Sequence, residues 1–312
     1  MSLRRLLTRV GMRQSGESNH PGRPTEGRDP AVPLPEDRIQ WMIKRLLPDR
    51  LKRPVMHAWK FSTTKYIVVS YPKSGRTWLR AALTFYFAER YGLENPPLLE
   101  YANLHYLDRR IPKIYFTHDD DPNVRPNELM RDKSRYRSKH VLYLARDPRD
   151  VCVSMYFHRK KRDLDLDIPI FEFANGAGGG LRTTIEFMNI WAEALADIPA
   201  SLVISYESLH AEPEETLTEV LRFVGEEPDP EAVRKAILRS QFDRLQSMEQ
   251  KGEFKSGRLT AADKEDKDSF KVRRGKVGGY RDYFDEQQQQ VLNEVSAKML
   301  SSLFASLIEE RN

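Results

Sequence analysis

The chain has 312 residues, of which 51 are lysine or arginine and 46 are aspartate or glutamate, giving a formal net charge of +5. Hydrophobic residues make up 39% of the sequence, which is too many for a wholly disordered chain. No apolar run approaches the roughly 18 residues of a membrane-spanning helix, and the single cysteine, Cys152, excludes a disulfide framework or a cysteine-rich zinc site. The weak positive charge suits an anionic ligand but does not indicate nucleic acid.

The first predicted segment, residues 1–36, is a flexible tail. Residues 16–35 are rich in glycine, proline, serine and glutamate and contain almost nothing to bury. Within residues 1–13, apolar residues recur at helical spacing among arginines, as in a basic amphipathic helix on a membrane surface or in a transit segment. We favour a solvated basic tail, because so short a segment binds membranes poorly.

From residue 37 to residue 312, strand and helix patterns alternate, which predicts one domain. Short β-branched runs predict strands at 66–70, 113–117, 141–145 and 201–205. Apolar spacing and capping residues predict helices at 36–47, 77–91, 148–161, 213–224 and 285–309. The glycine-rich stretch 175–180 reads as a loop or lid. This alternation predicts an α/β fold with a central parallel β-sheet flanked by helices.

The strongest local signal is the segment YPKSGRTW, residues 71–78, directly after the first predicted strand. A strand that leads through a glycine-containing loop into a helix directs backbone N–H groups and a positive helix end at an anion. Lys73 adds a charge, Thr77 a hydroxyl and Trp78 a flat face for a base. The Walker A pattern is absent, because the lysine precedes the only glycine. From these residues alone, an ordinary surface loop is the alternative.

This segment resembles the 5′-phosphosulfate loop, YPKSGTTW, of the cytosolic-type sulfotransferases, and three further segments follow in that family's order. ARDPRDVCVSMY (residues 145–156) is similar to R-N-P-K-D-x-x-x-S-x-Y. YESL with a later FVG (206–209 and 223–225) is similar to YEDL…FVG, and RRGKVGGYRDYF (273–284) to R-K-G-x-x-G-D-W-K-N-x-F. The resemblance spans roughly residues 37–290. It implies a P-loop-like fold and transfer of a sulfuryl group from 3′-phosphoadenosine 5′-phosphosulfate (PAPS) to a hydroxyl or amine, with no metal required.

The resemblance implies three catalytic residues. Lys73 is expected to stabilise the charge that develops on the bridging oxygen of the departing nucleotide, helped by backbone N–H groups of residues 74–77. His118, just after the second strand, is expected to take the proton from the acceptor, since an imidazole can accept a proton near neutral pH. Ser154 is expected to engage the lysine until the acceptor arrives, which restrains wasteful hydrolysis of the donor.

The resemblance also implies a nucleotide site. The residues expected to bind the co-substrate are Lys73, Ser74, Gly75, Arg76, Thr77, Trp78, Arg146, Ser154, Tyr206, Phe242, Arg273, Arg274 and Gly275. Arg146, Ser154 and residues 273–275 would hold the 3′-phosphate, because a guanidinium binds phosphate through two parallel hydrogen bonds. Trp78, Tyr206 and Phe242 would contact the adenine.

The chain departs from the family pattern at several positions. Phe116 replaces a lysine near the sulfuryl group, and Arg76, commonly threonine in the family, is a candidate to restore the positive charge. Gly279 and Tyr280 replace an Asp-Trp pair. We interpret the basic run at 159–162 as a solvated face, and Cys152 as an inert buried residue.

Two other functions stay open from the sequence: a P-loop-like kinase, which would lack both a Walker A loop and an evident magnesium site, and a non-catalytic nucleotide-binding relative, which Phe116 favours. The acceptor is expected to be a small molecule, a lipid or a glycan. Apolar segments at 85–87, 105–106 and 164–191 are candidates to contact it. We expect a cytoplasmic protein with no nucleic-acid partner, and the oligomeric state stays open.

Overall fold

The computed structural model describes residues 35–119, 121–163, 166–176, 178–254, 259 and 262–309. The predicted tail falls outside the described residues except for its last two positions, so its boundary stays a prediction. The chain divides into two units, residues 1–47 and 48–312, which are described separately. In the first unit, helix α2 (Pro35–Leu46) confirms the helix predicted at 36–47.

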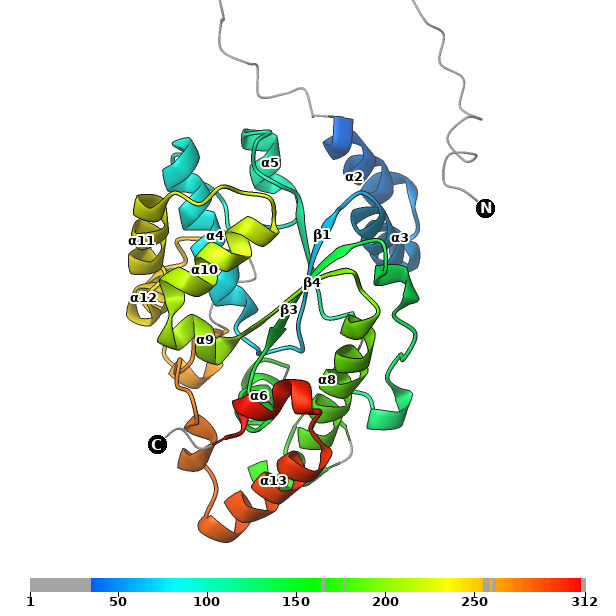
Figure 1. Ribbon diagram of the computed structural model, residues 1–312, viewed down its shortest axis with the longest axis vertical. Helices are drawn as coiled ribbons and strands as arrows, with labels where there is room; N and C mark the ends of the chain where they lie inside the picture. Colours follow the sequence, from blue (N-terminus) through cyan, green and yellow to red (C-terminus); the bar gives the residue numbers. More distant parts are fainter. Residues whose placement is uncertain are drawn as a thin grey trace, which may run out of the picture. The chain divides into compact units, whose positions relative to one another are not determined.

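Four parallel strands form the sheet of the second unit, in the order β2-β1-β3-β4 (Figure 1). They are β1 (Tyr66–Val69), β2 (Ile114–Thr117), β3 (His140–Ala145) and β4 (Ala200–Ser205). Tyr66 pairs with both Ile114 and His140, and His140 pairs with Ala200, so all four strands start in register. Each strand lies within one residue of its predicted bounds, and the predicted α/β fold with a parallel sheet is confirmed.

Helices cover both faces of this sheet. They are α3 (Asp49–Ser62), α4 (Arg76–Tyr91), α5 (Asn103–Leu107), α6 (Pro148–His158), α7 (Ile170–Asn175), α8 (Leu181–Ala196), α9 (Tyr206–Ala211), α10 (Pro213–Phe223), α11 (Pro230–Arg239), α12 (Phe242–Lys251) and α13 (Glu286–Met299). Successive strand side chains point to opposite faces. Val68 and Leu142 therefore enter the core that includes α4, α10 and α11, whereas the ring of Tyr143 lies 5.9 Å from that of Trp191 on α8. None of the described helices is long and apolar enough to cross a membrane.

Two predicted helices end earlier than expected. Helix α6 starts as predicted, with Asp147 as its N-cap, but its α-helical part ends at His158 and a π-helical turn, Arg159–Asp163, follows. The helix predicted at 285–309 stops at Met299, and a 3-10 helix, Ser302–Leu307, continues the chain. The cause of the second break is Asn189 of α8, which donates to the carbonyl of Met299 at 2.7 Å and accepts from the N–H of Ser301 at 2.8 Å.

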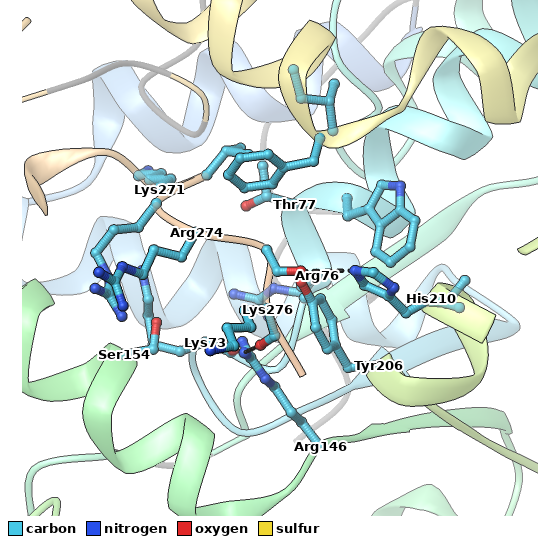
Figure 2. Close-up of a pocket in the computed structure, with 18 of the residues that line it drawn as sticks. Lys73, Arg76, Thr77, Arg146, Ser154, Tyr206, His210, Lys271, Arg274 and Lys276 are labelled. Atoms are coloured by element: carbon cyan, nitrogen blue, oxygen red, sulfur yellow. Dashed lines mark hydrogen bonds between the residues drawn. The ribbon is translucent and has the colours of Figure 1, made fainter. Parts of the chain in front are cut away.

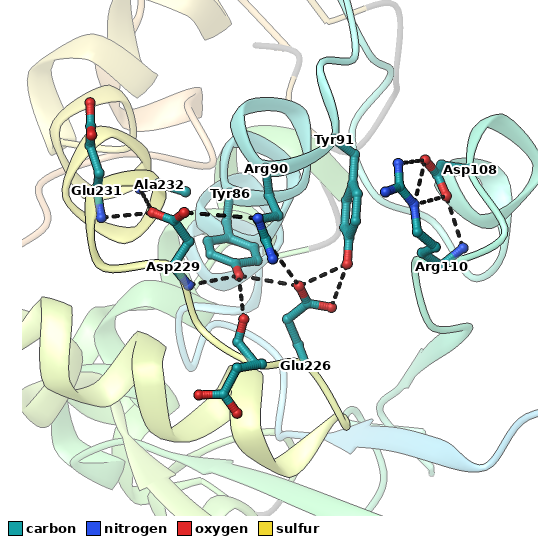
Figure 3. Close-up of polar contacts among 10 residues, drawn as sticks. Tyr86, Arg90, Tyr91, Asp108, Arg110, Glu226, Asp229, Glu231 and Ala232 are labelled. Atoms are coloured by element: carbon teal, nitrogen blue, oxygen red, sulfur yellow. Dashed lines mark hydrogen bonds and ion pairs between the residues drawn. The ribbon is translucent and has the colours of Figure 1, made fainter.

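A polar network joins the end of α4 to the segment before α11 (Figure 3). The hydroxyls of Tyr86 and Tyr91 donate to the buried carboxylate of Glu226 at 3.3 and 2.8 Å, and Arg90 lies 3.9 Å from the same carboxylate. Burial, and the nearby charge of Glu226, raise the pKa of both tyrosines to about 12. The network therefore fixes the far end of α4, the helix whose first residues belong to the site described next.

Candidate active site

Each of the four strands leads into a residue that the sequence analysis selected. Lys73 follows β1, His118 follows β2, Arg146 follows β3 and Tyr206 starts the helix after β4. The carboxyl ends of parallel strands lie along one edge of the sheet, and ligands bind where the direction of the connections reverses, here between β1 and β3. Across that point Nη1 of Arg146 donates to the backbone carbonyl of Lys73 at 3.0 Å.

A cavity of about 510 Å³ opens at this edge (Figure 2). The predicted residues that line it are Lys73, Gly75, Arg76, Thr77, Trp78, His118, Arg146, Ser154, Tyr206, Phe242, Arg273, Arg274 and Gly275. Ser74 is only 3% exposed and does not border the cavity. The structure thus brings together residues from segments that lie up to 200 positions apart, and the volume is typical of a small-molecule site.

The loop between β1 and α4 has an unusual backbone. Lys73 has φ +71°, which is uncommon for a residue with a side chain, and Gly75 has φ +96° at the N-cap of α4. A Cβ atom at Gly75 would lie 2.5 Å from Cδ2 of Tyr206, so a larger residue does not fit there. The positive end of α4 therefore meets the cavity, and its first N–H groups are suited to an anion.

The cavity is strongly cationic. Its lysine and arginine side chains are Lys73, Arg76, Arg80, Arg146, Lys271, Arg273, Arg274 and Lys276, and its only carboxylate among the described residues is that of Asp150. Asp150 is buried and accepts hydrogen bonds from the backbone N–H groups of Gly278 and Tyr280, each at 2.8 Å. It therefore fixes the C-terminal loop. Two carboxylates outside the cavity lining pair with other cations of the cavity: Asp268 with Arg273, and Asp282 with Arg274 and Lys276.

The positive charges around the cavity affect the protonation of Lys73. Burial, followed by the positive charges of Arg162, Lys271 and Arg273, lowers the pKa of Lys73 to about 7. The interpretation of residues 159–162 as a solvated face is therefore wrong for Arg162. The π-helical turn after α6 carries it, and its Nη1 donates to the carbonyl of the buried Ser269 at 2.7 Å.

His118 has defined partners on both ring nitrogens. Its Nδ1 lies 2.9 Å from the carbonyl oxygen of Ser70. Because a carbonyl only accepts, Nδ1 carries the hydrogen and Nε2 carries the lone pair. Nε2 is hydrogen-bonded to Nη2 of Arg76. Both side chains line the cavity. The candidate base therefore faces the site, and the lone pair on its Nε2 accepts a hydrogen bond from Arg76.

Phe116 lies close to a second arginine of α4. Its ring is 6% exposed, and the guanidinium carbon of Arg80 lies 4.0 Å from the ring centre. Nη1 of Arg80 donates to the carbonyl of Leu99 at 2.7 Å, in a buried position. The cytosolic-type sulfotransferases that the sequence resembles have a lysine at this position. Here the position is apolar and packs against an arginine.

The residue after His118 is fixed by an ion-pair cluster. Asp119, with φ +65°, has a fully buried side chain that pairs with Nζ of Lys133 at 2.7 Å. Arg135 and the hydroxyl of Tyr136 bind the same carboxylate. This cluster holds the end of β2, and with it the backbone of His118, in one position.

The loop after residue 270 carries the predicted 3′-phosphate residues. Arg273 lies 3.3 Å from Asp268 and Arg274 lies 2.9 Å from Asp282. Gly275 has φ +63°, and a Cβ atom there would lie 2.2 Å from the ring of Phe242. The loop therefore packs closely on the residue predicted to contact adenine.

An aromatic group also borders the cavity. The rings of Trp78, Tyr206 and His210 lie 5.7 to 6.0 Å apart, and the guanidinium of Arg146 lies 4.0 Å from the centre of the Tyr206 ring (Figure 2). Nε2 of His210 lies 2.8 Å from the carbonyl of Gly275.

The sequence analysis did not select His210, Lys271 or Lys276 as site residues. A signal for His210 was present: it lies four positions after Tyr206, on the same face of one helix. The two lysines flank the selected residues 273–275 in sequence.

The segments expected to contact the acceptor lie elsewhere. Phe85, Tyr86 and Phe87 are buried in the hydrophobic core, as are Phe173 and Phe187. None of these side chains borders the cavity. The acceptor contacts predicted at 85–87, 105–106 and 164–191 therefore stay a prediction.

Comparison with known proteins identifies the family. A family model described as "Sulfotransferase domain" matches residues 63–304. The chain belongs to the sulfotransferase family. Cytosolic sulfotransferase 17 of Arabidopsis thaliana is 27% identical over 294 residues, covering 83% of this chain and 80% of the relative. Sulfotransferase 2A6 of Mus musculus is 24% identical over 276 residues, covering 85% of this chain and 91% of that sulfotransferase.

Solved structures show the same fold. Mouse sulfotransferase SULT7A1 complexed with PAP aligns with a TM-score of 0.56 at 21% identity, over 78% of this chain and 88% of that one. Retinol dehydratase, in complex with androsterone and inactive cofactor PAP, aligns with a TM-score of 0.54 at 19% identity, over 76% and 80% of the two chains. The family match confirms the predicted enzyme class, a PAPS-dependent sulfotransferase, over the kinase alternative.

Proposed function

We propose that this sulfotransferase moves a sulfuryl group from PAPS to a hydroxyl or amine of a small acceptor, with Lys73, His118 and Ser154 as its catalytic residues. One observation carries the proposal: Lys73 and His118 follow adjacent strands and line the same cationic cavity. A donor with two anionic ends fits that cavity, because lysine and arginine side chains line it and the N-terminus of α4 meets it.

The proposed chemistry is an in-line displacement at sulfur. Nε2 of His118 takes the proton from the acceptor while the acceptor oxygen forms a bond to sulfur. The bond between sulfur and the bridging oxygen breaks, and its electron pair stays on that oxygen, where protonated Lys73 stabilises it. Such stabilisation is typically worth about 3–4 kcal/mol, so Lys73→Ala is expected to lower kcat by about 10²–10³.

The nucleotide contacts divide between two walls of the cavity. Arg146, Ser154, Arg273 and Arg274 are proposed to hold the 3′-phosphate, and Trp78, Tyr206 and Phe242 to hold the adenine. The ion pair between Arg274 and Asp282 supports this assignment, since a cation that rests on a carboxylate can exchange it for a phosphate.

We place the enzyme in the cytoplasm, in line with the names of its relatives. The acceptor is proposed to be a small molecule, and a screen with labelled PAPS against phenols, lipids and sugars distinguishes the acceptor classes. In the same screen Lys73→Ala serves as the inactive control.

The site is tested by nucleotide selectivity. We expect 3′,5′-diphosphoadenosine to bind far more tightly than 5′-AMP, ADP or ATP, because without the 3′-phosphate two arginines lose their partner. A difference of about 3 kcal/mol is about 150-fold in Kd. Calorimetry should show this preference shrinking in Arg273→Ala and Arg274→Ala. Equal stabilisation by ATP with Mg²⁺ would contradict the assignment of this cavity to PAPS.

A further inference from the structure

The contact between Arg76 and His118 has a consequence for the reaction. Nε2 of His118 is the nitrogen that the proposed mechanism uses as base, and in this structure it accepts a hydrogen bond from Nη2 of Arg76. A lone pair that already accepts from a guanidinium is not available to take a proton from an acceptor. The base is therefore occupied in this structure.

Arg76 is well placed to move to the donor. It is the first residue of α4, it lines the cavity, and it follows Lys73 by three positions in the loop. The other arginine of α4 near this point, Arg80, is 4% exposed and donates to a backbone carbonyl. Phe116, which packs on Arg80, supplies no charge of its own. Arg76 is therefore a cation that both contacts the base and lines the site.

We propose, building on the proposed function, that Arg76 is a further catalytic residue, which binds the sulfuryl oxygens of the donor and thereby releases Nε2 of His118. A guanidinium prefers an anionic oxygen to a neutral imidazole, because opposite charges attract and the guanidinium can bind two oxygens of one anion at once. Binding of the donor thus frees the base and places a positive charge on the group to be transferred. The released Nε2 then takes the acceptor proton as the acceptor–sulfur bond forms and the bond from sulfur to the bridging oxygen breaks.

The first test compares two nucleotides that differ only in the sulfuryl group. In Arg76→Thr, the Kd for PAPS should rise about tenfold, whereas the Kd for 3′,5′-diphosphoadenosine should stay within about twofold of the parent's. Arg274→Ala is the matched control, and it should weaken both nucleotides alike. If Arg76→Thr weakens both nucleotides equally, or neither, the proposal is wrong. If the parent itself binds neither nucleotide, the proposed function fails instead, so the two failures are distinguishable.

The second test reads the state of His118 without any activity. Diethyl pyrocarbonate modifies an imidazole through its free lone pair, and peptide mass spectrometry reports the rate at each histidine. In ligand-free Arg76→Thr, modification of His118 should be about tenfold faster than in the parent, with an intermediate rate in Arg76→Lys. His210, whose Nε2 is 2.8 Å from the Gly275 carbonyl, is the internal control and should not change. Equal rates at His118 in the parent and in folded variants, as judged by thermal unfolding, would overturn the proposal.

Discussion

The lowered pKa of Lys73 predicts that nucleotide binding takes up a proton. Burial and three neighbouring cations favour the neutral amine in the ligand-free protein and bring its pKa to about 7. A phosphate or phosphosulfate beside the amine favours the charged form instead, so the pKa rises on binding. One unit above its pKa, at pH 8, Lys73 is about nine-tenths neutral before binding, and uptake should approach about 0.9 proton per nucleotide. At pH 6 the contribution of Lys73 should fall to about 0.1.

Calorimetry can measure this uptake directly. Titrations with 3′,5′-diphosphoadenosine in buffers of different ionisation enthalpy give the number of protons exchanged at each pH. The phosphates contribute little at pH 8, because their second ionisation lies near pH 6. Lys73→Met is the matched control, since it keeps an unbranched side chain of similar length without the amine. An uptake below about 0.2 proton at pH 8 in the parent, or the same uptake in Lys73→Met, would refute the reasoning.

Three further outcomes are expected. The pKa of Lys73 is about 7 in the folded protein and 10.5 in the unfolded chain. Between these two pH values the unfolded chain binds more protons than the folded one. Lys73→Met should therefore raise Tm most at or below pH 7, with the gain disappearing near pH 10.5; a gain independent of pH would contradict this. Asp119→Ala should lower the free energy of unfolding in urea by about 3–5 kcal/mol, since it leaves the buried Lys133 without its carboxylate, and a loss below about 1 kcal/mol would contradict it. Gly275→Ala, whose Cβ would lie 2.2 Å from Phe242, should weaken 3′,5′-diphosphoadenosine binding about tenfold or more. Gly252 also has a positive φ, +68°, but a Cβ atom there would have no neighbour within 4 Å, so Gly252→Ala should bind the nucleotide normally. Equal effects of the two substitutions would refute the steric argument.

Local patterns predicted the sheet and the loop after β1 well. A buried strand, a glycine turn and a helix start are encoded by consecutive residues, so YPKSGRTW predicted the element boundaries. Parallel strands then place their carboxyl ends along one edge. For this reason residues chosen from separate motifs, such as Lys73 and Arg146, lie in one cavity.

The remaining features depend on contacts between distant residues, which periodicity does not report. Asn189 ends α13 from 110 positions away, and nothing in the sequence of that helix marks the break. Arg162 belongs to a run of four basic residues, and only the π-helical turn after α6 brings its charge to Lys73. The hydrogen bond between Arg76 and His118 joins two motifs, each of which can be predicted from its own residues. The contact between the two side chains depends on how β1 and β2 are paired.

The site has the properties expected of a binding site for an anion. Cations gathered around one cavity repel one another, and the strained backbone of Lys73 adds to that cost. In the ligand-free state Lys73 is close to half neutral at pH 7, and the proposed base has its lone pair on Arg76. An anionic donor reverses both conditions, because it favours the charged lysine and attracts the guanidinium away from the imidazole. The proposals for Lys73 and Arg76 therefore have one physical basis. The molecule that supplies the sulfuryl group also favours the charged form of Lys73 and frees Nε2 of His118.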